Sequence, residues 1–169
     1  MTHITLAVTG SISAYKAADI TSQLTKLGFE VKVLMTPSAQ KFIPPLTLQV
    51  LSTNQVELDV MMEDDPQRIE HIDIGKETDL FLVAPASANT IAKLAMGLAD
   101  NMVTSTALAL PQRTKKLLAP AMNTKMLEHP ATQRNLKLLQ DYGYQIIQPR
   151  DAVLACGDKG SGALATVET

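Results

Sequence analysis

A chain of 169 residues, 46% of them hydrophobic, is long enough for one domain around one core. Its 15 basic and 17 acidic residues include no run of Lys or Arg, which excludes the basic surface of a typical nucleic-acid binder. The chain has no apolar run near the ~18 residues of a membrane span, no signal-peptide pattern and one cysteine, which together favour a cytoplasmic protein without an internal disulfide.

The first 36 residues predict a strand, a helix and a second strand. Residues 3–10 form an apolar run ending at Gly10, which is typical of a strand buried on both faces of a parallel sheet. Ser11 or Ser13 can cap the helix that follows, and residues 30–36 form the second strand. Apolar residues at spacings of three, four and three share one face of that helix: Ala17, Ile20, Leu24 and Leu27.

The rest of the chain continues this alternation. A short helix at 46–53 follows two prolines, and further strands are expected at 79–85, 115–120 and 144–149, with helices after the first two. Between the helix at 46–53 and the strand at 79–85 lies an acidic run, which is expected to form a solvated turn: Glu63, Asp64 and Asp65. The pattern predicts an α/β fold with a central parallel sheet in three layers, flavodoxin-like or Rossmann-like. Ligands of such sheets bind outside the carboxyl ends of the strands.

The first of these strand ends suits an anion. Gly10 and Ser11 stand between the strand and the helix, although the dinucleotide fingerprint G-x-G-x-x-G is absent. Free N–H groups and the positive end of the helix dipole suit a phosphate, while an ordinary helix cap explains the residues equally well.

Two other strand ends carry short polar side chains. Ser87, Asn89 and Thr90 follow Pro85, which is expected to end its strand, and they suit a phosphate or a ring edge. Asn123 follows the strand at 115–120. Its side chain could cap a helix or hold a carboxylate through its amide donor, and the residues alone leave this open.

Two other residues carry reactive groups. His71 precedes an amphipathic turn, where a histidine is more often a surface residue than a catalyst, and no second ligand at zinc spacing supports a metal site. Cys156 lies in the glycine-rich segment 155–163, where burial as an inert thiol is not expected.

Together these motifs resemble, in order, those of the homo-oligomeric flavin-containing cysteine decarboxylases, over nearly the whole chain. The pattern is most similar to the branch that acts on phosphopantothenoylcysteine in coenzyme A synthesis. The matching motifs are Gly10-Ser11-Ile12, His71-Ile72, Ser87-Ala88-Asn89-Thr90, Pro120-Ala121-Met122-Asn123 and Ala155-Cys156-Gly157-Asp158.

The resemblance implies a single FMN-binding domain over 1–169, with a flexible substrate clamp at about 150–165, in a trimer or a dodecamer of trimers. It implies that the substrate's cysteine moiety is oxidised, loses CO2 as a thioaldehyde and is then reduced. His71 would serve as the base or position the reacting group, and Cys156 would supply the proton for reduction. Asn123 would hold the substrate carboxylate, beside Met122, Ala155 and Gly157. The implied FMN contacts are Gly10, Ser11, Ile12, Thr36, Ser38, Ser87, Ala88, Asn89, Thr90 and Ala121.

The sequence departs from the family pattern at two points. Leu127 stands where the family often has Trp, which is expected to alter packing but not chemistry. Many bacterial relatives also carry a ligase domain, for which 169 residues are too few, so we expect a separate ligase.

Three alternative functions stay open. A peptidyl-cysteine decarboxylase of the lantibiotic type stops at the enethiol and does not need Cys156. A regulatory binding protein would need neither His71 nor Cys156. An electron carrier would bind FMN but would need no substrate clamp.

Overall fold

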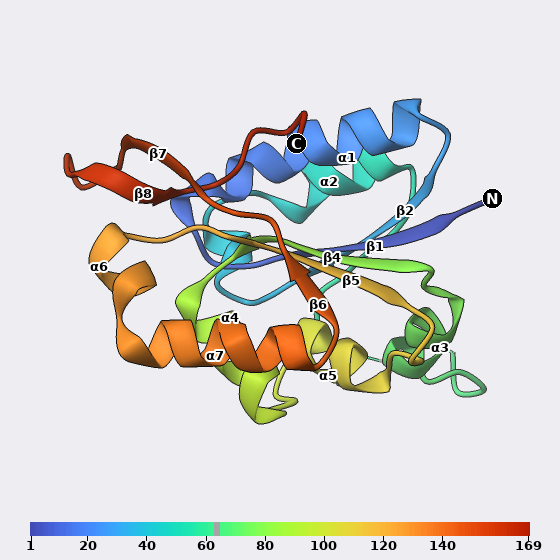
Figure 1. Cartoon of the computed structure of the whole chain (residues 1–169). Helices are drawn as coiled ribbons and strands as arrows, with labels where there is room; N and C mark the ends of the chain where they lie inside the picture. Colours follow the sequence, from blue (N-terminus) through green and yellow to red (C-terminus); the bar gives the residue numbers. More distant parts are fainter. Residues whose placement is uncertain (63–64) are drawn as a thin grey trace.

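A six-stranded parallel sheet lies between two layers of helices in the computed structural model, which describes residues 1–62 and 65–169 (Figure 1). The strand order is β3-β2-β1-β4-β5-β6, with β1 and β4 adjacent at the centre. This doubly wound order places the switch point between β1 and β4, and it confirms the predicted fold class. The strands are β1 His3–Val8, β2 Glu30–Met35, β3 Val56–Glu57, β4 Leu80–Ala86, β5 Lys115–Pro120 and β6 Tyr144–Ile146.

The helices cover both faces of the sheet, because successive side chains of a strand point to opposite sides. In β1, Leu6 and Val8 pack in one core cluster with residues of α1 and α2, while Ala7 packs in the other with residues of α4, α5 and α7. Figure 1 shows these two layers above and below the sheet. The α-helices are α1 Ala17–Lys26, α2 Pro45–Ser52, α3 Glu70–Glu77, α4 Ala88–Met96, α5 Met102–Ala109, α6 Thr124–Glu128 and α7 Pro130–Asp141, and the 3-10 helices are η1 Ile12–Lys16 and η2 Ala39–Lys41.

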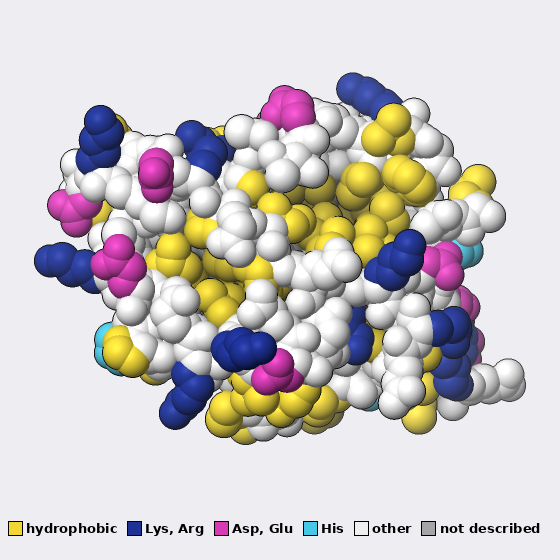
Figure 2. Space-filling view, in the orientation of Figure 1, with side chains coloured by type: hydrophobic (Ala, Val, Ile, Leu, Met, Phe, Trp, Pro, Cys, Tyr) yellow, Lys and Arg dark blue, Asp and Glu magenta, His cyan; other side chains and the backbone are white. Residues whose placement is uncertain are grey.

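The first predicted helix differs from the structure at both ends. It begins as η1, where the Ser11 hydroxyl accepts a hydrogen bond from the Ser13 N–H, and it becomes α-helical at Ala17. Leu27, which the spacing places on the apolar face of this helix, lies at the C-cap, where its side chain is 72% exposed. Leu27 borders a groove of about 300 Å³ between α1, β4, β5 and the segment 164–169, where Figure 2 shows a broad field of hydrophobic side chains.

Two further expectations need correction, and one helix was not expected. Pro85 does not end its strand, because β4 continues to Ala86. The predicted helix after residue 120 is divided into α6 and α7 at Pro130, where α7 starts. Helix α5 was not anticipated, although Asn101 and Thr104 form a capping box at its start, which is a readable signal.

A two-stranded antiparallel hairpin lies outside the carboxyl ends of the sheet strands (Figure 1). Its strands are β7 Arg150–Val153 and β8 Lys159–Ala163. At the tip, the Gly157 N–H donates to the Leu154 carbonyl, and Gly157 has φ +88°, as expected for a three-residue hairpin loop. The segment expected to be a clamp therefore forms a hairpin with Cys156 at its tip.

No helix within residues 1–62 and 65–169 is long and apolar enough to cross a bilayer. Asp65 is exposed and accepts a hydrogen bond from the Gln67 N–H, while Glu63 and Asp64 lie outside the described residues.

Candidate active site at the carboxyl ends of the strands

A buried threonine joins the two strands at the switch point. The Thr9 hydroxyl donates to the Pro85 carbonyl at 2.6 Å and accepts from the Ser87 N–H at 2.9 Å. Thr9 is fully buried, so these bonds fix the end of β1 against the start of α4. Thr9 was not a candidate from the sequence, because a threonine at a strand end carries no signal of its partner.

Two adjoining cavities open at this edge of the sheet. The hairpin cavity, of about 510 Å³, lies between η1, the end of β5 and the hairpin, and the α4 cavity, of about 410 Å³, lies between the end of β2 and the start of α4. The predicted residues that line the hairpin cavity are Gly10, Ser11, Ile12, Ser87, Ala88, Ala121, Met122, Asn123, Ala155 and Cys156. Those that line the α4 cavity are Gly10, Thr36, Ser38, Ser87, Ala88, Asn89 and Thr90.

The wall shared by the two cavities fits the phosphate of a flavin. Gly10, Ser87 and Ala88 border both cavities, and two helices begin there, capped by Ser11 and Ser87. A Cβ at Gly10 would lie 2.6 Å from the Ser38 Cβ, so only glycine allows this close approach. Free N–H groups at helix starts bind phosphates, and cavities of about 300–1,000 Å³ suit ligands of this size. The residues present therefore fit a flavin that carries a phosphate.

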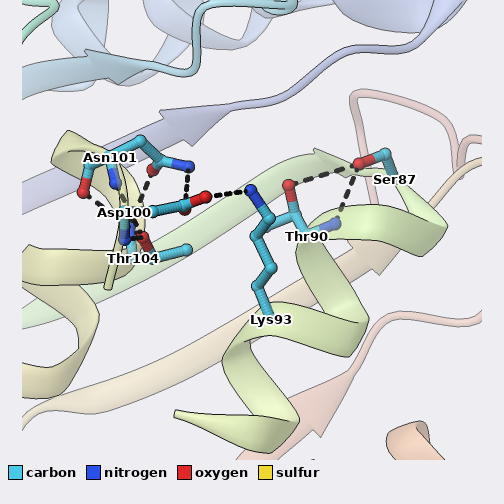
Figure 3. A network of polar contacts seen from close by, with 6 residues as sticks. All are labelled: Ser87, Thr90, Lys93, Asp100, Asn101 and Thr104. Atoms are coloured by element: carbon cyan, nitrogen blue, oxygen red, sulfur yellow. Dashed lines mark hydrogen bonds and ion pairs between the residues drawn. The ribbon is translucent and has the colours of Figure 1, made fainter. Parts of the chain in front are cut away.

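A polar network lines the far side of the α4 cavity (Figure 3). The Lys93 ammonium lies 2.6 Å from the Asp100 carboxylate, joining α4 to the turn before α5. The Asn101 amide donates to Asp100, and its oxygen accepts from the Thr104 N–H. The hydrogen bond from Lys93 lowers the pKa of Asp100. Lys93, Asp100, Asn101 and Thr104 were not candidates from the sequence, because their pairing depends on how α4 and α5 pack.

Asn123 faces the hairpin tip. Its Oδ1 accepts the Lys125 N–H at 2.9 Å and caps α6, so the amide NH2 points away from the helix. Nδ2 lies 3.3 Å from the Cys156 Sγ and 3.5 Å from the Asp158 carboxylate. The thiol in turn lies 3.5 Å from the same carboxylate. The sequence left open whether Asn123 caps a helix or donates through its amide. In the structure its oxygen caps α6 while its NH2 group donates toward the hairpin tip.

Backbone contacts fix the hairpin to the loop after β5. The Met122 N–H donates to the Gly162 carbonyl at 2.9 Å, and the Thr124 hydroxyl donates to the Ser161 carbonyl at 2.5 Å. A Cβ on Gly162, whose φ is +136°, would collide with the Met122 carbonyl oxygen. One arm of the hairpin is anchored, while Cys156 at the tip is exposed, as expected. Gly157 lies outside the lining of the hairpin cavity, and the structure gives it the backbone role of closing the turn.

Two further candidates lie away from this cluster. His71 is half-buried in the first turn of α3 and lines neither cavity, and Figure 1 shows α3 at the end of the molecule opposite the hairpin. Leu127 is buried in the core cluster formed by α4, α5 and α7, so it packs in the interior. Among the described residues, no group of three or more His, Cys, Asp or Glu could hold a metal.

Known proteins resemble this chain over nearly its whole length. The protein-family model described as Flavoprotein matches residues 1–169. A probable phosphopantothenoylcysteine decarboxylase of Streptococcus mutans serotype c is 66% identical over 166 residues, which cover 98% of this chain and 93% of that protein. A coenzyme A biosynthesis bifunctional protein of Bacillus subtilis is 46% identical over 166 residues. This match covers 98% of the present chain but only 40% of that protein.

Solved structures share the architecture. A cysteine-to-serine mutant of a PPC decarboxylase, complexed with pantothenoylaminoethenethiol, superposes with a TM-score of 0.89 at 32% identity and covers 99% of this chain and 92% of that one. The FMN-dependent cysteine decarboxylase SpaF gives a TM-score of 0.86 at 28% identity, covering 98% and 90% of the two chains.

Proposed function

The chain belongs to the Flavoprotein family, and on that premise we propose that it decarboxylates (R)-4′-phospho-N-pantothenoylcysteine to 4′-phosphopantetheine. The observation that carries the proposal is the cluster of Asn123, Cys156 and Asp158, of which Asn123 and Cys156 line the hairpin cavity at the carboxyl ends of the strands. The name of the 66% identical relative supports the same substrate.

Each residue of the cluster has a distinct task in this reaction. The amide NH2 of Asn123 binds the carboxylate that leaves as CO2, because its own oxygen is engaged by the Lys125 N–H. The Cys156 thiol delivers a proton to the carbon that lost CO2, and Asp158 orients that thiol. The overall reaction releases CO2 without net oxidation. Enclosure of the substrate under the hairpin keeps water from the reacting carbon.

FMN is the proposed cofactor. Two capped helix starts at the shared wall suit one phosphate, and the dinucleotide fingerprint that would accompany FAD is absent after β1, where only Gly10 is present. When bound, the flavin takes up and returns the electron pair of the cysteine moiety. Thr36, Ser38, Asn89 and Thr90 would hold it in the α4 cavity.

A second copy of the chain completes the proposed site. His71 lines neither cavity of its own chain, so its proposed role requires that it reach a neighbouring protomer's cavity. Exposed apolar side chains on the outer faces of the helices support assembly, because such surface is costly in water. These include Leu46 and Val50 on α2 and Leu108 on α5. A trimer, or a dodecamer of trimers, is the proposed assembly.

A direct assay tests the function. Purified protein reconstituted with FMN is incubated with phosphopantothenoylcysteine, and CO2 and phosphopantetheine are measured together. We expect a yellow protein that releases equal amounts of both over many turnovers. A peptide with C-terminal cysteine is the comparison substrate. Decarboxylation of the peptide alone would show a peptidyl-cysteine decarboxylase, and a flavoprotein inactive on both would contradict the proposal.

A further inference from the structure

The hairpin cavity carries a charge opposite to that of the chain. Its lining includes Lys16 and Arg150, while none of the described residues that line it is Asp or Glu. The whole chain has a formal net charge of −2. Neither cation has a carboxylate partner among the described residues, so both charges are available to a ligand. We propose that Lys16 and Arg150 form the subsite for the 4′-phosphate of the substrate, an inference that rests on the proposed function.

Arg150 is held for this task by one backbone contact. Its Nε donates to the carbonyl of Leu164, which is 2% exposed, at 3.0 Å. This bond fixes the plane of the guanidinium and leaves its two terminal nitrogens to donate elsewhere. A planar guanidinium binds a phosphate through two parallel hydrogen bonds, and a lysine adds a second positive charge.

The spacing along the hairpin matches the length of the substrate. Arg150 begins β7 and Cys156 lies at the tip, so a strand rise of about 3.3 Å per residue places them roughly 10–20 Å apart. In extended phosphopantothenoylcysteine about thirteen bonds separate the phosphorus from the sulfur, the span of four to five extended residues or about 15 Å. A substrate with its sulfur beside Cys156 therefore brings its phosphate to the base of the hairpin.

The phosphate of FMN has a separate place. Gly10 and Ser87, beside the two capped helix starts, border both cavities, whereas Lys16 and Arg150 line only the hairpin cavity. Two anionic ligands that occupy one site together each need their own countercharge. In this arrangement, backbone N–H groups bind the phosphate of the cofactor, and the side chains of Lys16 and Arg150 bind the phosphate of the substrate.

Substrate preference tests the subsite. FMN-loaded wild type, Arg150→Gln and Lys16→Gln are each assayed with phosphopantothenoylcysteine and with pantothenoylcysteine, which lacks the phosphate. We expect each substitution to reduce the ratio of kcat/KM for the two substrates by about 10- to 100-fold, since charged hydrogen bonds to the phosphate are lost. Lys159→Gln is the matched control, because Lys159 is an exposed cation of the same hairpin outside the cavity lining, and the ratio should stay at the wild-type value.

Binding of product gives a second readout that is independent of turnover. The affinities of the FMN-loaded proteins for 4′-phosphopantetheine and pantetheine are compared by calorimetry, and flavin content is measured by absorbance. We expect the two variants to lose preference for the phosphorylated product while they retain flavin. An unchanged preference in both assays, or loss of FMN from the variants, would overturn the subsite. Failure of the wild type to decarboxylate either substrate would instead refute the proposed function, and the calorimetric preference would still decide whether the phosphate binds here.

Discussion

The amide nitrogen of Asn123 lies 3.3 Å from the sulfur of Cys156, although 33 positions separate the two residues in the sequence. Asn123 is fixed by its cap at the start of α6, whereas Cys156 stands on the hairpin tip. The contact therefore joins the rigid edge of the sheet to the hairpin. A substrate carboxylate bound by the amide would lie directly beside the thiol. Asn123 can therefore serve the decarboxylation and Cys156 the reduction that follows.

Cys156→Ser should separate these two half-reactions. A serine hydroxyl has a similar size but is a far weaker acid than a thiol, whose usual pKa is near ~8.5. We expect the variant to bind FMN and to release at most one CO2 per site, then to stop with a product two hydrogens lighter than phosphopantetheine. Mass spectrometry and the flavin absorbance after one turnover check this. Repeated turnover to normal phosphopantetheine would contradict the role of Cys156, and absence of any CO2 would place the residue in the first half-reaction.

His71→Asn should abolish CO2 release while the protein keeps its flavin. Loss of a general base costs ~10²–10⁴ in rate, and α3 lies outside both cavities, so flavin retention is expected. The variant is assayed for CO2 release, and its flavin content is measured after gel filtration. Near-normal turnover would show that His71 takes no part in the reaction, and loss of flavin would show a structural role instead.

Mixed oligomers test whether His71 acts in a neighbouring protomer. His71→Asn and Asn123→Ala chains are each expected to be inactive, and they are unfolded, mixed and refolded together. If the site takes His71 from one copy and Asn123 from another, about a quarter of sites in randomly mixed oligomers regain both residues. Activity measured against total protein checks this. A mixture as inactive as its components would show that one chain supplies both residues, and a monomer in sedimentation would exclude the shared site.

Gly162→Ala should displace the hairpin from the loop after β5. The added Cβ would collide with the Met122 carbonyl oxygen and would break the hydrogen bond from the Met122 N–H to Gly162. We expect a large increase in KM for phosphopantothenoylcysteine. Gly28→Ala is the control, because Gly28 has φ +86° and open space around it. Both substitutions place an alanine at a positive φ, but only Gly162→Ala adds a collision, so a change in KM confined to Gly162→Ala supports hairpin docking.

Lys93→Gln should destabilise the protein in a pH-dependent way. The hydrogen bond from Lys93 lowers the pKa of Asp100 in the folded state. The pair therefore contributes stability above the ordinary aspartate pKa of about 3.9, and this contribution is lost as the pH falls through the lowered folded pKa. Thermal unfolding from pH 7 downward should show a lower Tm for the variant at neutral pH and convergence with wild type in acid. A constant Tm difference at every pH would point to lost packing instead.

The sequence alone was sufficient for the alternation of strands and helices and for the edge of the sheet that holds the site. Apolar runs such as residues 115–120 identify buried strands because both faces of a parallel sheet are covered. The polar residues after these strands, Ser87 and Asn123 among them, could be located because parallel strands end at one common edge.

Only the tertiary structure decided which side chains meet and which do not. Lys93 and Asp100 pair because α4 and the turn before α5 pack together, and local sequence carries no record of that packing. Leu27 fits an apolar helical stripe, yet it is exposed because it lies at the helix end beyond the packed core. His71 belongs to the motif set but lies apart from Cys156 in the fold, because a motif orders residues along a chain while the packing of elements sets their separation in space.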